Sequence, residues 1–284
     1  MSKVTNSEIL EYASSKEGRA SAPLEYKIVD HFTDSKQLIL LPLSPKSSGT
    51  YLRNVLSEYL GAHQCTFSYT SRLGNRDIHI PKLIELCSTK HKRFVAHQHT
   101  FSWQANLRLI KRWNINVVYV NRPILDCINS LVYMVEAEWT NKGFPKKHGG
   151  FHFLGGPFLE DMTKAERRSY ILRCSVPWYL SYNMGWVEAR RAIAKSNFTL
   201  MHYDEIAADN LGAVTKILNR LGISDVDHVR LNKIQENLID DPKKIRLRKG
   251  ETKNTLDEFS TSDLEYYEQM IQPLKQILKR ERLY

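Results

Sequence analysis

The sequence predicts a three-layer α/β fold, in which helices cover both faces of a central parallel sheet. Four short apolar runs have the length of buried strands, and each is followed by a helical pattern or by a loop that leads to one. These runs are Leu38 to Leu43, Phe94 to Ala96, Val117 to Val120 and Phe198 to His202. Polar clusters follow the runs, and the carboxyl ends of parallel strands meet at one edge of a sheet. We therefore expect one ligand site at that edge.

The predicted helices follow from apolar residues at helical spacing. The first covers Leu52 to Leu60 and ends before Gly61, a residue typical of helix C-caps. The other helical patterns are Trp103 to Ile110, Ile124 to Val135, Thr163 to Lys195, Ala207 to Leu221 and Leu264 to Leu278. Pro177 interrupts the longest of them, which predicts one bent helix or two helices there.

Length and composition favour a single cytoplasmic domain. The chain has 284 residues with 42% hydrophobic content, and no repeat or long linker divides it. We expect one domain over residues 1–284, with residues 1–35 as a loosely packed N-terminal extension. No apolar run approaches the ~18 residues of a membrane span, and the polar start lacks the pattern of a signal peptide. The four cysteines include no C-x-x-C pair, which favours reduced thiols.

The net charge of +10 predicts an anionic partner, either a nucleotide or a nucleic acid. Five basic residues crowd into one short stretch: Lys243, Lys244, Arg246, Arg248 and Lys249. Such a cluster forms either a phosphate clamp or a solvated basic loop, and composition does not decide between them.

The junction between the first strand and the first helix, Ser44 to Thr50, has the features of a phosphate site. A helix start leaves N–H groups unpaired, small residues let a ligand approach the backbone, and Lys46 adds a positive charge. In a kinase-type P-loop the lysine follows the glycines, whereas Lys46 precedes the small residues. The run Val117 to Val120 also leads into Asn121 and Arg122 rather than into an aspartate that would bind magnesium. An arginine there suits phosphate.

These motifs resemble those of the cytosolic-type sulfotransferases, which use 3′-phosphoadenosine 5′-phosphosulfate (PAPS). Pro45 to Tyr51, P-K-S-S-G-T-Y, is similar to the family loop P-K-S-G-T-T-W, with Ser48 where the family usually has glycine. The other matches are a strand-end arginine with a serine eight residues later (Arg122 and Ser130), a Y-E-D-L-like segment (Tyr203 to Ile206), and the start of an R-K-G loop (Arg248 to Gly250). Together they cover about Leu38 to Asn254.

The resemblance implies a P-loop-like sulfotransferase fold and three groups of donor-site residues. The 5′-phosphosulfate would lie against Ser47, Ser48, Gly49 and Thr50. The 3′-phosphate would be held by Arg122, Ser130, Arg248 and Lys249, next to Gly250. Adenine would contact Tyr51 and Tyr203. An arginine can bind phosphate through two parallel hydrogen bonds. A structural ion pair for Arg122 and core packing for Tyr51 are the alternatives.

Sulfuryl transfer needs a base for the acceptor proton and a cation at the leaving oxygen. We predict Lys46 for the leaving oxygen. The resemblance places His99 at the family's histidine and His97 at its lysine, so we expect His99 to be the base and His97 a second polar group. A shift in register would exchange them. Two other interpretations remain. The two histidines could form a zinc set with Cys87 and His91, although the spacing of these residues matches no compact metal motif. They could also be a buried, hydrogen-bonded structural pair.

The acceptor region is rich in aromatic residues and glycine. Residues Thr140 to Pro157 show no period and predict a loop that could wall a pocket with Phe144, Phe151 and Phe153. A second aromatic set recurs every four residues and predicts a core-facing helix side: Trp178, Tyr182 and Trp186.

The sequence therefore predicts a PAPS-dependent sulfotransferase that sulfates a hydroxyl or amine of a small-molecule acceptor, releases PAP (adenosine 3′,5′-bisphosphate) and uses no metal. We expect no nucleic-acid partner and no membrane span, and a homodimer is allowed. One alternative is a P-loop kinase, which would require magnesium and ATP. Others are a non-catalytic nucleotide- or nucleic-acid-binding protein, and a degenerate enzyme that binds the nucleotide without transfer.

Overall fold

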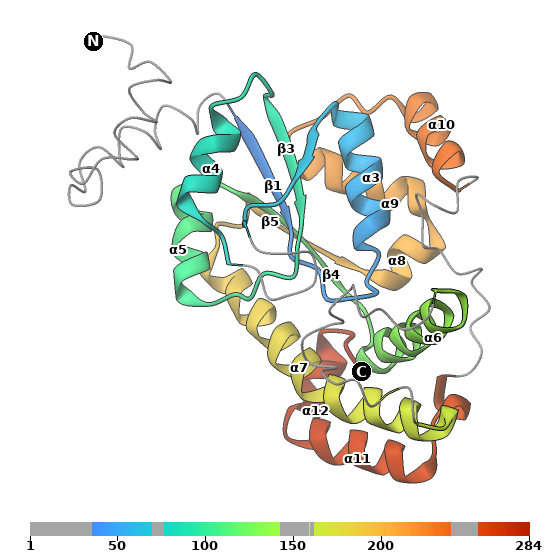
Figure 1. Ribbon diagram of the computed structural model, residues 1–284. Coiled ribbons are helices and arrows are strands. Elements are labelled where there is room, and N and C mark those ends of the chain that lie inside the picture. The colour runs from blue at the N-terminus through green and yellow to red at the C-terminus, as the bar shows by residue number, and fades with distance from the viewer. Residues whose placement is uncertain (1–35, 70–76, 143–158, 160–161, 240–254) are drawn as a thin grey trace, which may run out of the picture.

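A five-stranded parallel sheet forms the centre of the molecule (Figure 1). This computed structural model describes residues 36–69, 77–142, 159, 162–239 and 255–284. The strands are β1 (Gln37–Leu41), β2 (His63–Cys65), β3 (Arg93–His97), β4 (Asn116–Asn121) and β5 (Phe198–His202), in the order β2-β3-β1-β4-β5. All neighbouring pairs are parallel, which confirms the predicted fold class and four predicted strands. The short strand β2 was not predicted.

The strand order creates a switch point between β1 and β4. The chain leaves β1 toward β2 and β3 on one side, and it leaves β4 toward β5 on the other, while β1 and β4 are themselves paired. Ligands of open parallel sheets bind at the carboxyl end of such a switch point. The register places His97 beside Leu41 and His202 beside Asn121, so the segments after these four strands begin at the same edge.

Helices cover both faces of the sheet. They are α3 (Gly49–Leu60), α4 (Ile80–Cys87), α5 (Gln104–Arg112), α6 (Ile124–Lys142), α7 (Lys164–Ala192), α8 (Tyr203–Ala208), α9 (Asn210–Arg220), α10 (His228–Ile239), α11 (Thr261–Ile271) and α12 (Lys275–Arg280), with the 3-10 helices η3 (Thr255–Glu258) and η4 (Gln272–Leu274). Figure 1 shows α4 and α5 on the opposite side of the sheet from α3, α9 and α10. Helix α7 packs against α6 and α11.

Three helical patterns differ from the sequence prediction. Helix α6 includes Thr140, so the predicted acceptor loop begins later than expected. Asp209 divides the pattern before Leu221 into α8 and α9, because its carboxylate caps the start of α9. Pro273 lies where the last pattern divides into α11 and α12, since proline lacks the N–H that a continuous helix needs. Helix α7 runs through Pro177 as one element.

Among the described residues, a buried apolar cluster joins the sheet to its helices. Trp178 is 9% exposed and both Tyr182 and Trp186 are 0% exposed, which confirms the predicted core-facing side of α7. The carboxyl end of the chain packs against the start of α6, where the Leu283 carbonyl accepts the N–H of Ile124 at 2.9 Å. Within the described ranges, no helix has the length and apolarity of a membrane span.

Candidate active site

The loop after β1, residues Ser44 to Ser48, contains two residues in the left-handed region of backbone conformation. Lys46 has a φ of 68° and Ser48 has a φ of 69°. When left-handed residues alternate with ordinary ones, successive N–H groups point toward one place, an arrangement that binds anions. Gly49 and Thr50 then open α3, whose first turn has neither a side-chain cap bond nor an acidic residue. The positive end of this helix is therefore suited to an anionic ligand.

Two buried hydrogen bonds hold this loop in place. Ser47 is fully buried, and its hydroxyl donates to the Ser44 carbonyl at 2.6 Å. From α7, the hydroxyl of Tyr179 donates to the Pro45 carbonyl at 2.9 Å. The Ser47 hydroxyl, which we predicted to face the phosphosulfate, is thus used inside the loop, while Ser48 is half-buried at its surface.

A guanidinium group bridges the switch point between β1 and β4. Arg122 directly follows β4, and its Nη1 donates to the Lys46 carbonyl at 2.6 Å. Its Cζ lies 4.0 Å from the ring centroid of Tyr203, at the start of α8. Its Nε is buried and has no hydrogen-bond partner. A buried charged donor without a partner is costly, so this group is suited to a ligand that accepts hydrogen bonds.

The two histidines predicted for acid–base chemistry lie at the end of β3. The strand ends at His97, so His99 stands beyond it rather than on the face of a continuing strand. Their ring centroids are 5.7 Å apart and the rings are nearly perpendicular. Nδ1 of His99 lies 2.6 Å from the Leu43 carbonyl oxygen. Because a carbonyl oxygen can only accept, Nδ1 carries the proton of the neutral ring and Nε2 is its basic nitrogen.

His97 packs directly on the start of α3. A Cβ atom added to Gly49 would come within 2.0 Å of Nε2 of His97. The absence of a side chain at Gly49 therefore lets the imidazole approach the first turn of the helix. This places His97 at the predicted phosphosulfate site, with His99 as its neighbour.

The remaining predicted donor residues differ in their surroundings. Tyr51 is 3% exposed, on the helix that packs against α10. Burial raises the pKa of Tyr51, and the nearby Gln235 side chain partly opposes this. Its ring has no exposed face for adenine, so core packing describes its present role. Ser130 is half-buried on α6. The predicted residues outside the described part are Phe144, Phe151 and Phe153 of the acceptor loop and, near the carboxyl end, Lys243, Lys244, Arg246, Arg248, Lys249 and Gly250.

An aromatic cluster that we did not predict lies beside His99. Trp178 meets the His99 ring edge-on, with centroids 6.4 Å apart. Phe101 packs edge-on against Trp178 at 5.7 Å and stacks on Trp103 at 5.1 Å. Trp103 is 53% exposed, so the cluster leads from the candidate base to the protein surface. No sequence period could reveal it, because its members come from two distant segments.

Two observations concern the metal and thiol interpretations. Among them, no three His, Cys, Asp or Glu side chains gather closely enough to hold a metal ion. His91, a member of the zinc interpretation, stacks on His63 with ring centroids 4.6 Å apart. Burial raises the pKa of Cys127 to about 12, so this thiol stays protonated near neutral pH.

Comparisons with protein-family models and with curated proteins return no match. Solved structures do match. Mouse sulfotransferase SULT7A1 complexed with PAP gives a TM-score of 0.57 at 16% identity, over 93% of each chain. Sulfotransferase STF1 from Mycobacterium tuberculosis H37Rv gives a TM-score of 0.48 at 14% identity, over 88% of this chain and 81% of that one. Together with the parallel sheet and its switch point, the first of these likenesses shows that the chain has the fold of the PAPS-dependent sulfotransferases.

Proposed function

We propose that this protein is a PAPS-dependent sulfotransferase, which transfers the sulfuryl group of PAPS to a hydroxyl or amine of a small-molecule acceptor and releases PAP. One observation carries the proposal. Arg122 has a buried N–H without a partner, and its 2.6 Å contact with the Lys46 carbonyl joins it to a helix start that is suited to an anion. Two anion-binding elements this close together suit a nucleotide with phosphate groups at both its 5′ and its 3′ positions.

The chain's residues fit such a donor. The backbone from Lys46 to Thr50 would bind the 5′-phosphosulfate, because its N–H groups lie at the positive end of α3. Arg122 and Ser130 would bind the 3′-phosphate, and the resemblance adds Arg248 and Lys249 to this group. Tyr203, which stacks against the Arg122 guanidinium, is proposed to contact adenine. When bound, PAPS supplies the activated sulfuryl group.

The proposed base is His99. Its Nδ1–H is held by the Leu43 carbonyl, so Nε2 is the nitrogen that would take the acceptor proton. The same contact would stabilise the imidazolium ion that forms. Lys46 is proposed to offset the charge that grows on the leaving oxygen, and His97 to contact the transferring group from its position against Gly49. No step of this scheme requires a metal ion.

The aromatic cluster beside His99 supports an acceptor with an apolar body. Phe101, Trp103 and Trp178 are the aromatic residues that lead from the His99 ring to the surface. Aromatic side chains bind apolar ring systems well and offer few hydrogen bonds to sugars. We therefore propose an alcohol, phenol or amine on an apolar scaffold.

Thermal unfolding of the purified protein tests the donor site, because a ligand that binds only the native state raises the unfolding midpoint. PAP, ATP with magnesium, and AMP are added in parallel at equal concentrations. We expect a rise in the midpoint with PAP and little change with AMP, which lacks the 3′-phosphate. A rise with ATP alone, or with none of the three, would contradict the proposed function.

A further inference from the structure

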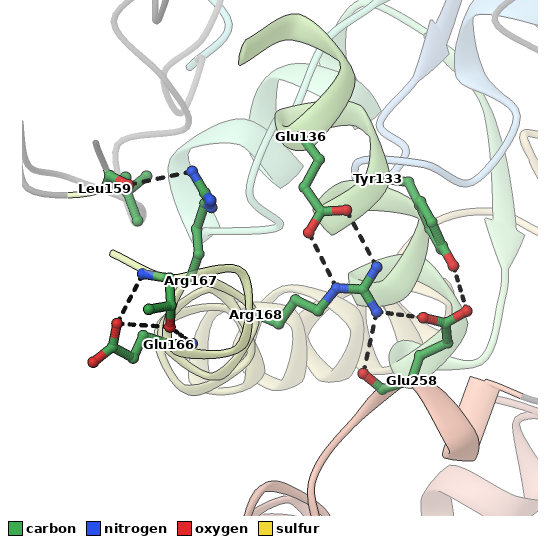
Figure 2. A network of polar contacts seen from close by, with 8 residues as sticks. Tyr133, Glu136, Leu159, Glu166, Arg167, Arg168 and Glu258 are labelled. Atoms are coloured by element: carbon green, nitrogen blue, oxygen red, sulfur yellow. Dashed lines mark hydrogen bonds and ion pairs between the residues drawn. The ribbon is translucent and has the colours of Figure 1, made fainter. Parts of the chain in front are cut away.

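Arg168 of α7 joins α6 and η3 to its own helix through a partly buried set of polar contacts (Figure 2). Its guanidinium makes a two-pronged contact with Glu136 of α6, at 3.1 Å from Nε and 3.2 Å from Nη2. Its Nη1 donates to the Glu258 carboxylate in η3, and also to the Glu258 carbonyl at 3.3 Å. The Tyr133 hydroxyl of α6 donates to the other Glu258 carboxylate oxygen. These four residues, which we call the Arg168 cluster, fasten η3 and α6 to α7.

Charge and geometry together make arginine the residue that this cluster needs. Arg168 is 8% exposed, and the side chains of Glu136 and Glu258 are 18% and 17% exposed. The hydrogen bonds that Arg168 donates, to Glu136 and then to Glu258, raise the pKa of Arg168 against the effect of burial. A planar fork can bind both carboxylates at once, whereas a lysine offers only a point charge.

The face of α6 that holds η3 also carries Ser130. Asp126, Ser130 and Tyr133 follow at spacings of four and three residues, which places them on one stripe of the helix. Thr255, at the start of η3, donates to Asp126 at 2.7 Å. Glu258, at the end of η3, accepts from Tyr133. Ser130 therefore lies between the two points at which η3 is fastened to α6.

We propose that Arg168 is a positioning residue for the 3′-phosphate site, which acts by fixing the place of Ser130 relative to Arg122. The start of α6 is already fixed, because Arg122 directly follows β4 and Ile124 begins the helix. The far half of α6 is held by the Arg168 cluster, so the place of Ser130 depends on both attachments. This inference rests on the proposed function, in which Ser130 and Arg122 bind the 3′-phosphate.

The inference predicts a selective loss of affinity. Loosening the Arg168 cluster should weaken contacts to the 3′-phosphate but spare those to the 5′-phosphate, because the loop after β1 has its own supports. The probes are PAP and AMP, which differ by the 3′-phosphate, and the measured quantity is the ratio of their dissociation constants. A purely structural role for Arg168 would change both affinities equally or lower the unfolding midpoint alone.

The test uses calorimetric titration of the full chain. Arg168→Lys keeps the charge and removes the fork, and should weaken PAP binding by about tenfold while AMP binding changes by less than about twofold. Arg168→Met removes the cation from between two half-buried carboxylates, which risks misfolding. Tyr133→Phe and Thr255→Ala each loosen one end of η3 mildly, and should shift the ratio in the same direction by smaller amounts.

Arg173→Lys is the matched control. Arg173 lies on the same helix and pairs with Asp263 of α11 at 3.4 Å, so it links α7 to α11 and not to α6. Arg173→Lys should have the same ratio of PAP and AMP dissociation constants as the wild type. The inference is overturned if the wild type prefers PAP while Arg168→Lys, Tyr133→Phe and Thr255→Ala keep the wild-type ratio. A wild type that does not prefer PAP overturns the proposed function, and the inference with it.

Discussion

The two edges of the sheet both carry positive charge, but they differ in its amount and in its use. At the amino edge lies a cavity of about 1010 Å³, and no described Asp or Glu lines it. Five cations do: Lys36, Lys90, Lys92, Arg93 and Arg220. The candidate active site at the carboxyl edge rests on far fewer described cations, chiefly Lys46 and Arg122. By charge and size alone, the amino edge would be the better anion site.

Two cations of the amino edge bind carbonyl groups of the protein itself. Lys36 donates to the carbonyls of Thr89 and His91, both at 2.8 Å, after the end of α4. Arg93 donates to the carbonyl of Leu60, the last residue of α3, at 3.2 Å. Helices of a parallel α/β fold end at this edge, so their unpaired carbonyls and negative dipole ends attract positive side chains.

At the carboxyl edge the balance is reversed, because helices begin there and N–H groups are in excess. Helix α3 starts without a side-chain cap, and Nε of Arg122 is buried without a partner. A density of positive charge therefore marks a basic surface, whereas donors that the fold leaves without acceptors mark the place for an anion. The predictions below compare the two edges, from the largest expected effect to the smallest.

The largest effect should come from His99→Ala and Lys46→Ala. Loss of a base, or of a cation at a developing charge, lowers turnover by about 10²–10⁴-fold. PAP formation from PAPS is followed with a panel of apolar alcohols, phenols and amines. Lys92→Ala, which removes a cation from the amino edge, should keep the wild-type rate. If His97→Ala abolishes turnover and His99→Ala does not, the two histidines have exchanged roles.

Arg122→Ala should weaken PAP binding by about 2 kcal/mol or more, because hydrogen bonds to a charged group are lost. It also removes the contact with the Lys46 carbonyl. Titration calorimetry measures the affinity. Arg220→Ala, at the amino edge, is the matched control and should bind PAP as the wild type does. Equal losses in both variants would mean that overall charge, and not the switch point, governs binding.

Glycines at the two ends of α3 should respond in opposite ways to alanine. At Gly49 the new Cβ would meet the His97 ring, whose imidazole is the end of a side chain and can move. We expect a loss of turnover of about tenfold, as for a misplaced catalytic group, with little change in stability. At Gly61, with a φ of 58° and no atom within 4 Å of the new Cβ, we expect stability to fall by about 1 kcal/mol and turnover to persist. If alanine at Gly49 lowered stability and left turnover unchanged, His97 would not belong to the active site.

Much of the fold was predictable because each main strand carries a local apolar signal. The four predicted runs became β1, β3, β4 and β5. Strand β2, with the sequence H-Q-C, has two exposed residues and one half-buried residue, so no apolar pattern could reveal it. Its pairing with β3 supplies the structure that its sequence does not indicate.

The candidate site was predictable only where a motif lies within one segment. The loop around Lys46 and the position of Arg122 after β4 follow from local sequence. The contact between Tyr179 and Pro45 spans 134 residues, and the direction of the buried Ser47 hydroxyl depends on how the loop folds. The burial of Tyr51 likewise depends on α10, which no sequence pattern predicted. Contacts between distant segments leave no periodic trace, so they required the structure.

The smallest effect should be a gain in stability from Ser48→Gly. Ser48 has a φ of 69°, and a side chain in this conformation costs about 1 kcal/mol or more relative to glycine. Urea denaturation should therefore show an increase of about 1 kcal/mol in the free energy of unfolding. At the amino edge, Asn114 also has a positive φ, of 46°. Asparagine tolerates this region, and the Asn114 side chain accepts a hydrogen bond from Asn197, so Asn114→Gly should lower stability. If Ser48→Gly also lowers stability, the loop after β1 does not adopt the left-handed turn from which the anion site was inferred.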